Sequence, residues 1–185
     1  MIMIHSVTPQ TILDFWFTEI DSKLWWTKDA AFDALIRERF VQVHTQANRG
    51  ELVDWRDTAQ GRLAEIIVLD QFSRNMFRDT PRAFASDVLA LVLAQEAVRA
   101  GHHLDVPANM RGFMFLPFMH SESAWMHERA LVLYTELGEP NQLDFEYKHK
   151  RIIDRFGRYP HRNVILGRIS TEEELAFLKE ADSSF

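Results

Sequence analysis

Residues 58–78, TAQGRLAEIIVLDQFSRNMFR, place charged side chains on a helix face where the pattern calls for apolar ones. The apolar residues that recur there at helical spacing are Leu63, Ile66 and Ile67. The same face continues to Asp70 and then to Arg74, a separation at which two helical side chains can pair. The stretch therefore predicts a helix, starting near Asp57 or Thr58, that carries an acid and an arginine toward the interior.

The rest of the chain is punctuated by helix starts and stops. N-caps are expected at Thr8, Thr27, Ser86, Ser121 and Ser170, the last in a capping box that reaches Glu173. Helix ends are expected at Gly50, Gly101, Gly138 and Gly157, and a break at Pro117. The helix expected after Ser86 carries the apolar residues Val88, Leu91, Val92 and Val98. We expect an all-α fold of about eight helices, stacked as antiparallel hairpins, in one domain over residues 1–185.

Composition narrows the class of protein. A net charge of −6 argues against broad nucleic-acid binding, which needs a basic face. No cysteine is present, which excludes disulfides, thiolate-bound zinc and a thiol nucleophile. The start, MIMIHSVTP, is a poor signal peptide, and no apolar run approaches the roughly 18 residues of a membrane span. We expect a cytoplasmic protein without a membrane segment.

A second inward polar residue is expected in the helix over residues 141–156. Its stripe of Phe145, Ile152 and Phe156 also contains His149. Burying such a group is costly unless it is paired. Two interpretations stay open: a local structural partner such as a backbone carbonyl, or helix faces that converge on a polar cavity.

Two Arg-Asn corners supply candidate ligand-binding residues. The first contains Arg74 and Asn75, and the second, FGRYPHRN, contains Arg158, His161, Arg162 and Asn163. Guanidinium groups bind carboxylates and phosphates in a two-pronged way, and Trp25 and Trp26 could add stacking walls. The alternative is that the arginines pair with nearby acids at the surface, which we favour for Arg78 and Arg168.

The segment MHSESAW provides candidates for proton transfer. His120 precedes the expected helix and Glu122 lies in its first turn, so with Asp70 and His149 they form a possible acid–base set. Glutamate in a first turn is also favoured by the helix dipole alone. The eight histidines form no recognised metal-ligand spacing, so we expect neither a metal nor another cofactor.

Several long motifs carry a resemblance to a known family. ILDFWF, VLDQFSRNMFRDTPRAFASD, FLPFMHSES and RFGRYPHRNVILGRISTEEELAFL together resemble the uncharacterised bacterial family called domain of unknown function 924, over about residues 12–178. The resemblance implies a tetratricopeptide-like stack of helices. It places Asp70, Arg74, His120 and the FGRYPHRN turn in family motifs but implies no reaction.

Three functions are compatible with these residues. The first is binding of a small anionic metabolite or a peptide carboxylate in a cationic, amide-rich pocket. The second is a general acid–base enzyme, hydrolase-like, using the same pocket. The third is a protein-interaction scaffold, which rests on fold analogy and would expose Trp25, Trp26 and Trp125 along one face. The oligomeric state does not follow from the sequence.

Overall fold

The computed structural model describes residues 7–184, so His5 and the rest of the MIMIHS start lie outside it, as does Phe185. Its α-helices are α1 Pro9–Asp14, α2 Ala30–Asn48, α3 Ala59–Ile67, α4 Ser73–Met76, α5 Asp87–Arg99, α6 Ala108–Met119, α7 Ala124–Leu137, α8 Pro140–Phe156 and α9 Glu172–Phe177. No strand occurs in this part of the chain. The predicted all-α class is confirmed.

Two α-helices are continuous in space although their hydrogen-bond pattern changes. A π-helical turn, Val68–Phe72, joins α3 to α4, so residues 59–76 form one rod. Counted in this way, the described residues contain eight helical rods, in agreement with the expected number. The tetratricopeptide-like arrangement stays a prediction.

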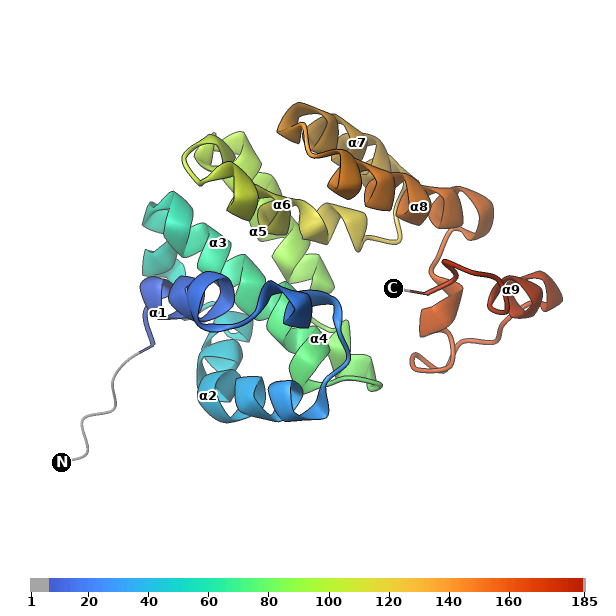
Figure 1. The fold of residues 1–185 in the computed structure, drawn as a ribbon, viewed down its shortest axis with the longest axis horizontal. Coiled ribbons are helices and arrows are strands. Elements are labelled where there is room, and N and C mark those ends of the chain that lie inside the picture. Colours follow the sequence, from blue (N-terminus) through green and yellow to red (C-terminus); the bar gives the residue numbers. More distant parts are fainter. Residues whose placement is uncertain (1–6, 185) are drawn as a thin grey trace.

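Neighbouring helices pack in chain order through the second half of the molecule. α5 contacts α6, α6 contacts α7, and α7 contacts α8, and Figure 1 shows these four helices side by side. α3 lies against α1, α5 and α6, which places the rod with Asp70 at the centre. After α8 the chain turns back and ends in the small α9 region.

The core is one large apolar cluster with a small satellite. Aromatic rings from three rods meet at its centre, where Phe72 stacks on Phe40 and contacts Phe15 and Trp16 edge-on. The satellite lies where the C-terminal segment returns to α8, and consists of Ile152, Ile153, Tyr159 and Phe177, with Phe156 against it. Tyr159 therefore anchors the FGRYPHRN turn.

Several predicted helix ends are confirmed. Thr8 caps α1 through its side chain and Thr58 caps α3. Gly138 and Gly157 follow α7 and α8 in the left-handed conformation, which glycine adopts without a steric penalty. Pro117 lies inside α6, which ends two residues later at Met119.

Two predicted N-caps were wrong by two residues. Asp29, not Thr27, caps α2, because its carboxylate accepts the Phe32 N–H at 2.9 Å. The N-cap position of α7 is Ser123 rather than Ser121.

The capping box before α9 is shifted by one residue. It joins Thr171 to Glu174, whose backbone and side-chain bonds are reciprocal. Ser170, the predicted cap, instead accepts a hydrogen bond from Asn163. Ser86 stands before α5, but its hydroxyl donates to Asn48 at 2.8 Å and caps nothing.

The apolar residues of α5 are not all buried. Val88 is 75% exposed and Val92 is 46% exposed, whereas the buried residues are Ala90, Leu93, Ala94 and Ala97. Both faces of this helix are apolar in sequence, so periodicity alone does not distinguish them. The alanine face allows α3 and α6 to approach closely. No helix of the described residues is both long and apolar enough to cross a bilayer.

Candidate functional site

The π-helical turn brings Asp70 into the interior, where the carboxyl group is 1% exposed. Its Oδ1 accepts a hydrogen bond from His120 Nδ1 at 2.7 Å and lies 3.2 Å from Arg74 Nη1. Its Oδ2 accepts from Gln71 at 2.6 Å. Burial would raise the pKa of Asp70, but the positive charge of Arg74 and the bonds from His120 and Gln71 hold it well below its usual range. Asp70 is therefore a carboxylate.

The ionised Asp70 fixes the tautomer of His120. A carboxylate only accepts hydrogen bonds, so the Nδ1 atom of His120 must carry the proton. Burial, followed by the charge of Arg74, lowers the pKa of His120 below its ordinary value, so Nε2 carries a lone pair at neutral pH. Among the described residues Nε2 makes no hydrogen bond, and it is not one of the atoms sealed from solvent. His120 thus presents an oriented, unprotonated nitrogen.

The two Arg-Asn corners meet through Asp87, which the sequence analysis did not select. Arg74 binds both oxygens of Asp87, at 2.9 and 3.1 Å, and Arg162 Nη1 reaches the same carboxylate at 3.3 Å. Asp87 opens α5, where an acid is explained by the helix dipole alone. No spacing rule connects it with residues 13 and 75 positions away.

Arg162 lies flat between two rings. Its guanidinium carbon is 4.6 Å from the ring centres of both Phe84 and Tyr159, and Nη2 donates to the His120 carbonyl at 3.0 Å. Its Nε is buried without a partner in residues 7–184. Burial and the like charge of Arg74, only partly offset by Asp87, lower the pKa of Arg162. The positive charge of Arg162 is therefore less fully balanced by nearby carboxylates than that of Arg74.

A second acid–histidine pair lies behind Tyr159 and was also missed. His127 Nδ1 is 2.7 Å from Glu146 Oε1, and neither side chain is exposed. His127 Nε2 donates to the Ser121 carbonyl at 2.9 Å and lies 3.3 Å from the Tyr159 hydroxyl. The Tyr159 hydroxyl donates to the Met119 carbonyl, so it is committed to structure. Burial raises the pKa of Glu146, with the His127 bond opposing it.

Two further histidines from the predicted set surround the same tyrosine. The His149 and His161 rings lie 5.8 and 5.5 Å from the Tyr159 ring, and His149 lies 6.4 Å from His120. Nδ1 of His149 contacts the Phe145 carbonyl at 2.7 Å, the local backbone partner that the first interpretation required. Burial lowers the pKa of His149 to about 3 and that of His161 to about 4.

The remaining polar candidates bind elsewhere. Asn75 donates to Asp33 on α2, which also binds Arg78, as the pairing interpretation of Arg78 expects. Arg158 makes two hydrogen bonds to Glu174 and holds α9.

Glu122 and Asn163 support the second corner from outside the cluster. Glu122 accepts two hydrogen bonds from Arg168 and one from the Tyr159 backbone. Asn163 contacts Ser170 and Arg168. Both side chains brace the FGRYPHRN turn.

Comparison with known proteins places the chain in a family. The model described as "Bacterial protein of unknown function (DUF924)" matches residues 12–182. The chain belongs to this family. A solved structure of a protein of unknown function from Agrobacterium tumefaciens is similar, with a TM-score of 0.89 and 43% identity over 94% of this chain and 97% of that one. A search of curated proteins finds no match.

In this member of the DUF924 family, the tryptophan pair lies away from the polar cluster. Trp25 donates to the Trp16 carbonyl and packs on Phe113, and Trp26 is 68% exposed and stacks on Phe113. No contact of the described residues joins either ring to the cluster around Asp70. The walls of that cluster are Phe84 and Tyr159 instead.

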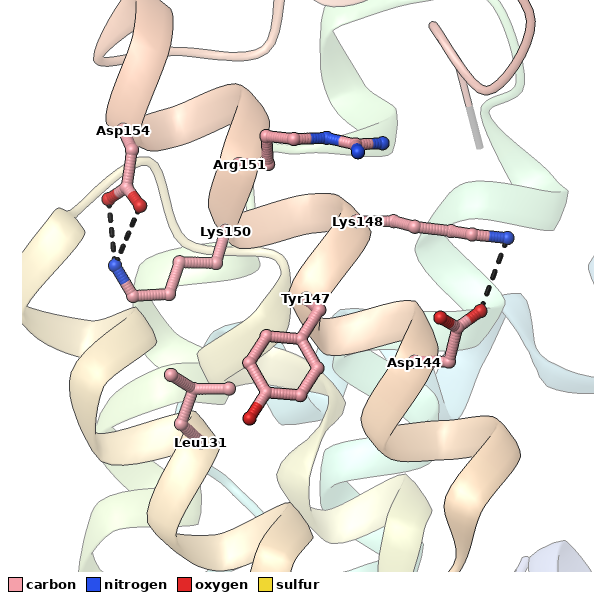
Figure 2. A pocket seen from close by; sticks show the side chains of 7 residues that line it. All are labelled: Leu131, Asp144, Tyr147, Lys148, Lys150, Arg151 and Asp154. Atoms are coloured by element: carbon pink, nitrogen blue, oxygen red, sulfur yellow. Dashed lines mark hydrogen bonds and ion pairs between the residues drawn. The ribbon is translucent and has the colours of Figure 1, made fainter.

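The larger of two surface pockets, about 480 Å³, does not coincide with the cluster either. Figure 2 shows it on the α7–α8 face, lined by Leu131, Asp144, Tyr147, Lys148, Lys150, Arg151 and Asp154. Lys150 is paired with Asp154, and Lys148 with Asp144, whereas Arg151 forms no ion pair in residues 7–184. In residues 7–184 no group of three or more potential ligand side chains is arranged to hold a metal.

Proposed function

We propose that the protein is a general acid–base enzyme in which His120 is the catalytic base and Asp70 positions it. The main supporting observation is the 2.7 Å bond from His120 Nδ1 to the buried Asp70, which leaves Nε2 unprotonated on a side chain that is 14% exposed. A base with a fixed tautomer and an accessible lone pair is what proton abstraction needs. Of the functions open from the sequence, this one draws the most direct support.

The two arginines beside His120 indicate which charge the proposed reaction would develop. Arg74 lies 3.2 Å from Asp70, and Arg162 donates to the backbone carbonyl of His120, so positive charge flanks the base on two sides. A hydrolysis fits this arrangement: Nε2 removes a proton from water, the hydroxide attacks an electrophilic centre, and the cations stabilise the developing anion. His120 then returns its proton to the leaving group.

The proposal is tested by hydrolysis of a panel of p-nitrophenyl carboxylate and phosphate esters. The H120Q and D70N variants should lose about 100-fold or more in kcat/KM, the range of general-base catalysis. H102Q, which alters a histidine on the turn His102–Leu104 away from the cluster, is the matched control. Activity in H120Q equal to that of wild type would contradict the proposal.

Binding of a small anionic molecule or peptide carboxylate is the second candidate. Arg162 favours it, because its Nε has no partner within residues 7–184 and its contact to Asp87 is long, at 3.3 Å. Arg74 is the weaker ligand group because Asp70 and Asp87 already occupy it. Succinate should raise the Tm of wild type but not of R162K, which keeps the charge and loses the planar fork. An equal shift in both proteins would argue against this candidate.

A further inference from the structure

A second polar pocket opens between the end of α2 and the loop that precedes α5. Its volume is about 210 Å³, and its side chains include His44, Asn48 and Arg49 from α2 and Phe77, Arg82 and Ser86 from the α4–α5 connection. None of these residues belongs to the proposed active site. Its lining residues include no carboxylate.

Positive charge gathers at this pocket with little acidic charge to match it. The Arg82 guanidinium lies 3.8 Å above the Phe77 ring and that of Arg37 lies 5.4 Å from the same ring, and neither forms an ion pair in the described chain. Arg49 has one acidic neighbour, Glu51, at the loose distance of 3.9 Å. The α7–α8 pocket differs, because two carboxylates, Asp144 and Asp154, line it and pair with Lys148 and Lys150.

The floor of the pocket is built from buried polar groups. Ser73 donates to the Leu69 carbonyl, so His44 Nε2 must donate to the Ser73 hydroxyl at 2.7 Å and its Nδ1 is the acceptor. Asn48 donates to the His44 carbonyl at 2.9 Å and accepts from Ser86. These bonds hold the side chains of the floor in place before binding, so that less conformational entropy is lost when a ligand binds.

We propose that this pocket binds a small molecule through a phosphate group, with Arg82 and Arg49 as its cationic ligands. Arg82 forms no ion pair in the described chain and Arg49 only a loose one, and two such guanidinium groups suit a tetrahedral dianion, since each can bind two of its oxygens. The cavity holds a phosphate and a few further atoms. The site is independent of His120, although Ser73 and Ser86 adjoin Arg74 and Asp87 in the chain.

The test is titration with inorganic phosphate, followed by calorimetry and amide chemical shifts. R82A should weaken binding about tenfold or more, because a hydrogen bond to a charged group contributes about 1.5–3 kcal/mol. R99A, on the exposed side of α5 and paired with Glu96, is the matched control and should bind as wild type does. H120Q should also bind normally, which separates this site from the proposed function.

Three results would overturn the proposal. They are the absence of phosphate binding by wild type, equal binding by wild type and R82A, and shifts confined to residues around His120. Acetate in place of phosphate distinguishes a carboxylate site, which would bind both with similar strength. If R82A does not fold, as judged by circular dichroism, phosphate binding by R49A and R82K is compared with that of wild type instead.

Discussion

Asp87 determines whether the two arginine corners act together. Its carboxylate is 16% exposed and bonds to Arg74 and Arg162, which would otherwise repel each other in the interior. Asp70, Asp87, Arg74 and Arg162 then sum to zero charge, so His120 can remain neutral beside them. The charge balance of the site therefore depends on a residue whose local role, opening α5, looks purely structural.

Removing Asp87 should be costly. D87A leaves two buried guanidinium groups with too few partners, and breaking a buried ion pair costs about 3–5 kcal/mol. D87N, which keeps the shape and one acceptor, should cost less. Urea denaturation measures both, with R99A as a surface control expected within about 0.5 kcal/mol of wild type. A D87A loss as small as that of R99A would mean that the arginines find other partners.

The buried histidines should make stability depend on pH. Burial lowers the pKa of His44 to about 4, of His161 to about 4 and of His149 to about 3, whereas an unfolded histidine titrates near about 6.5. Between these values the unfolded chain binds more protons, so the free energy of unfolding falls as pH drops below about 6.5. Each group contributes a slope of at most about 1.4 kcal/mol per pH unit.

The variant H44Q should flatten this dependence by one such contribution. Unfolding free energies from urea titrations between pH 7 and pH 5 measure it, above the range in which most carboxylates titrate. The same slope in H44Q and wild type would show that His44 is already protonated, or exposed, in the folded protein.

At the scale of elements, the sequence was informative where one face differs clearly from the others. Inward Asp70 followed from the apolar spacing before it, and the structure places it 1% exposed. The buried face of α5 could not be predicted, because valines and alanines make both of its faces apolar. Phe145 on α8 is similarly 49% exposed although it was assigned to the inward stripe. The pattern of apolar residues along one helix does not predict which of its apolar faces a neighbouring helix covers.

The buried face of α5 can be tested by truncation. L93A removes a side chain that is 8% exposed and should cost about 2–5 kcal/mol, because it leaves a cavity. V88A removes a side chain that is 75% exposed and should change the unfolding free energy by less than about 0.5 kcal/mol. Chemical denaturation of both variants measures the two losses, and a larger loss from V88A would contradict the buried face that the structure shows.

At the scale of the whole molecule, the site is assembled from distant segments. Asp70 and His120 are 50 residues apart, and Arg162 meets Asp87 across 75 residues. Helix patterns predicted which side chains turn inward but not which of them meet, because that depends on how the rods stack. Trp25 and Trp26 were assigned to the site from residue type alone, and the stacking places them elsewhere.

The C-terminal segment is fastened by ion pairs as well as by the satellite core. Arg158 binds Glu174, whose side chain is 3% exposed, and Arg168 binds Glu122. R158A should leave the buried Glu174 carboxylate short of partners and increase hydrogen exchange in residues 160–184, while α3 and α6 keep their protection. R155A, whose ion pair to Glu173 is exposed, is the matched control. Uniform exchange increases in all helices would contradict a local fastening.

The central claim is that Asp70 holds His120 as a neutral base with a free Nε2. Long-range ¹H–¹⁵N correlation spectra of the imidazole rings, recorded across a pH titration with H120Q for assignment, measure it directly. The structure predicts an Nδ1–H tautomer for His120 at neutral pH and a pKa below the ordinary value of about 6.5. An Nε2–H tautomer, or a ring still doubly protonated at pH 7, would contradict it.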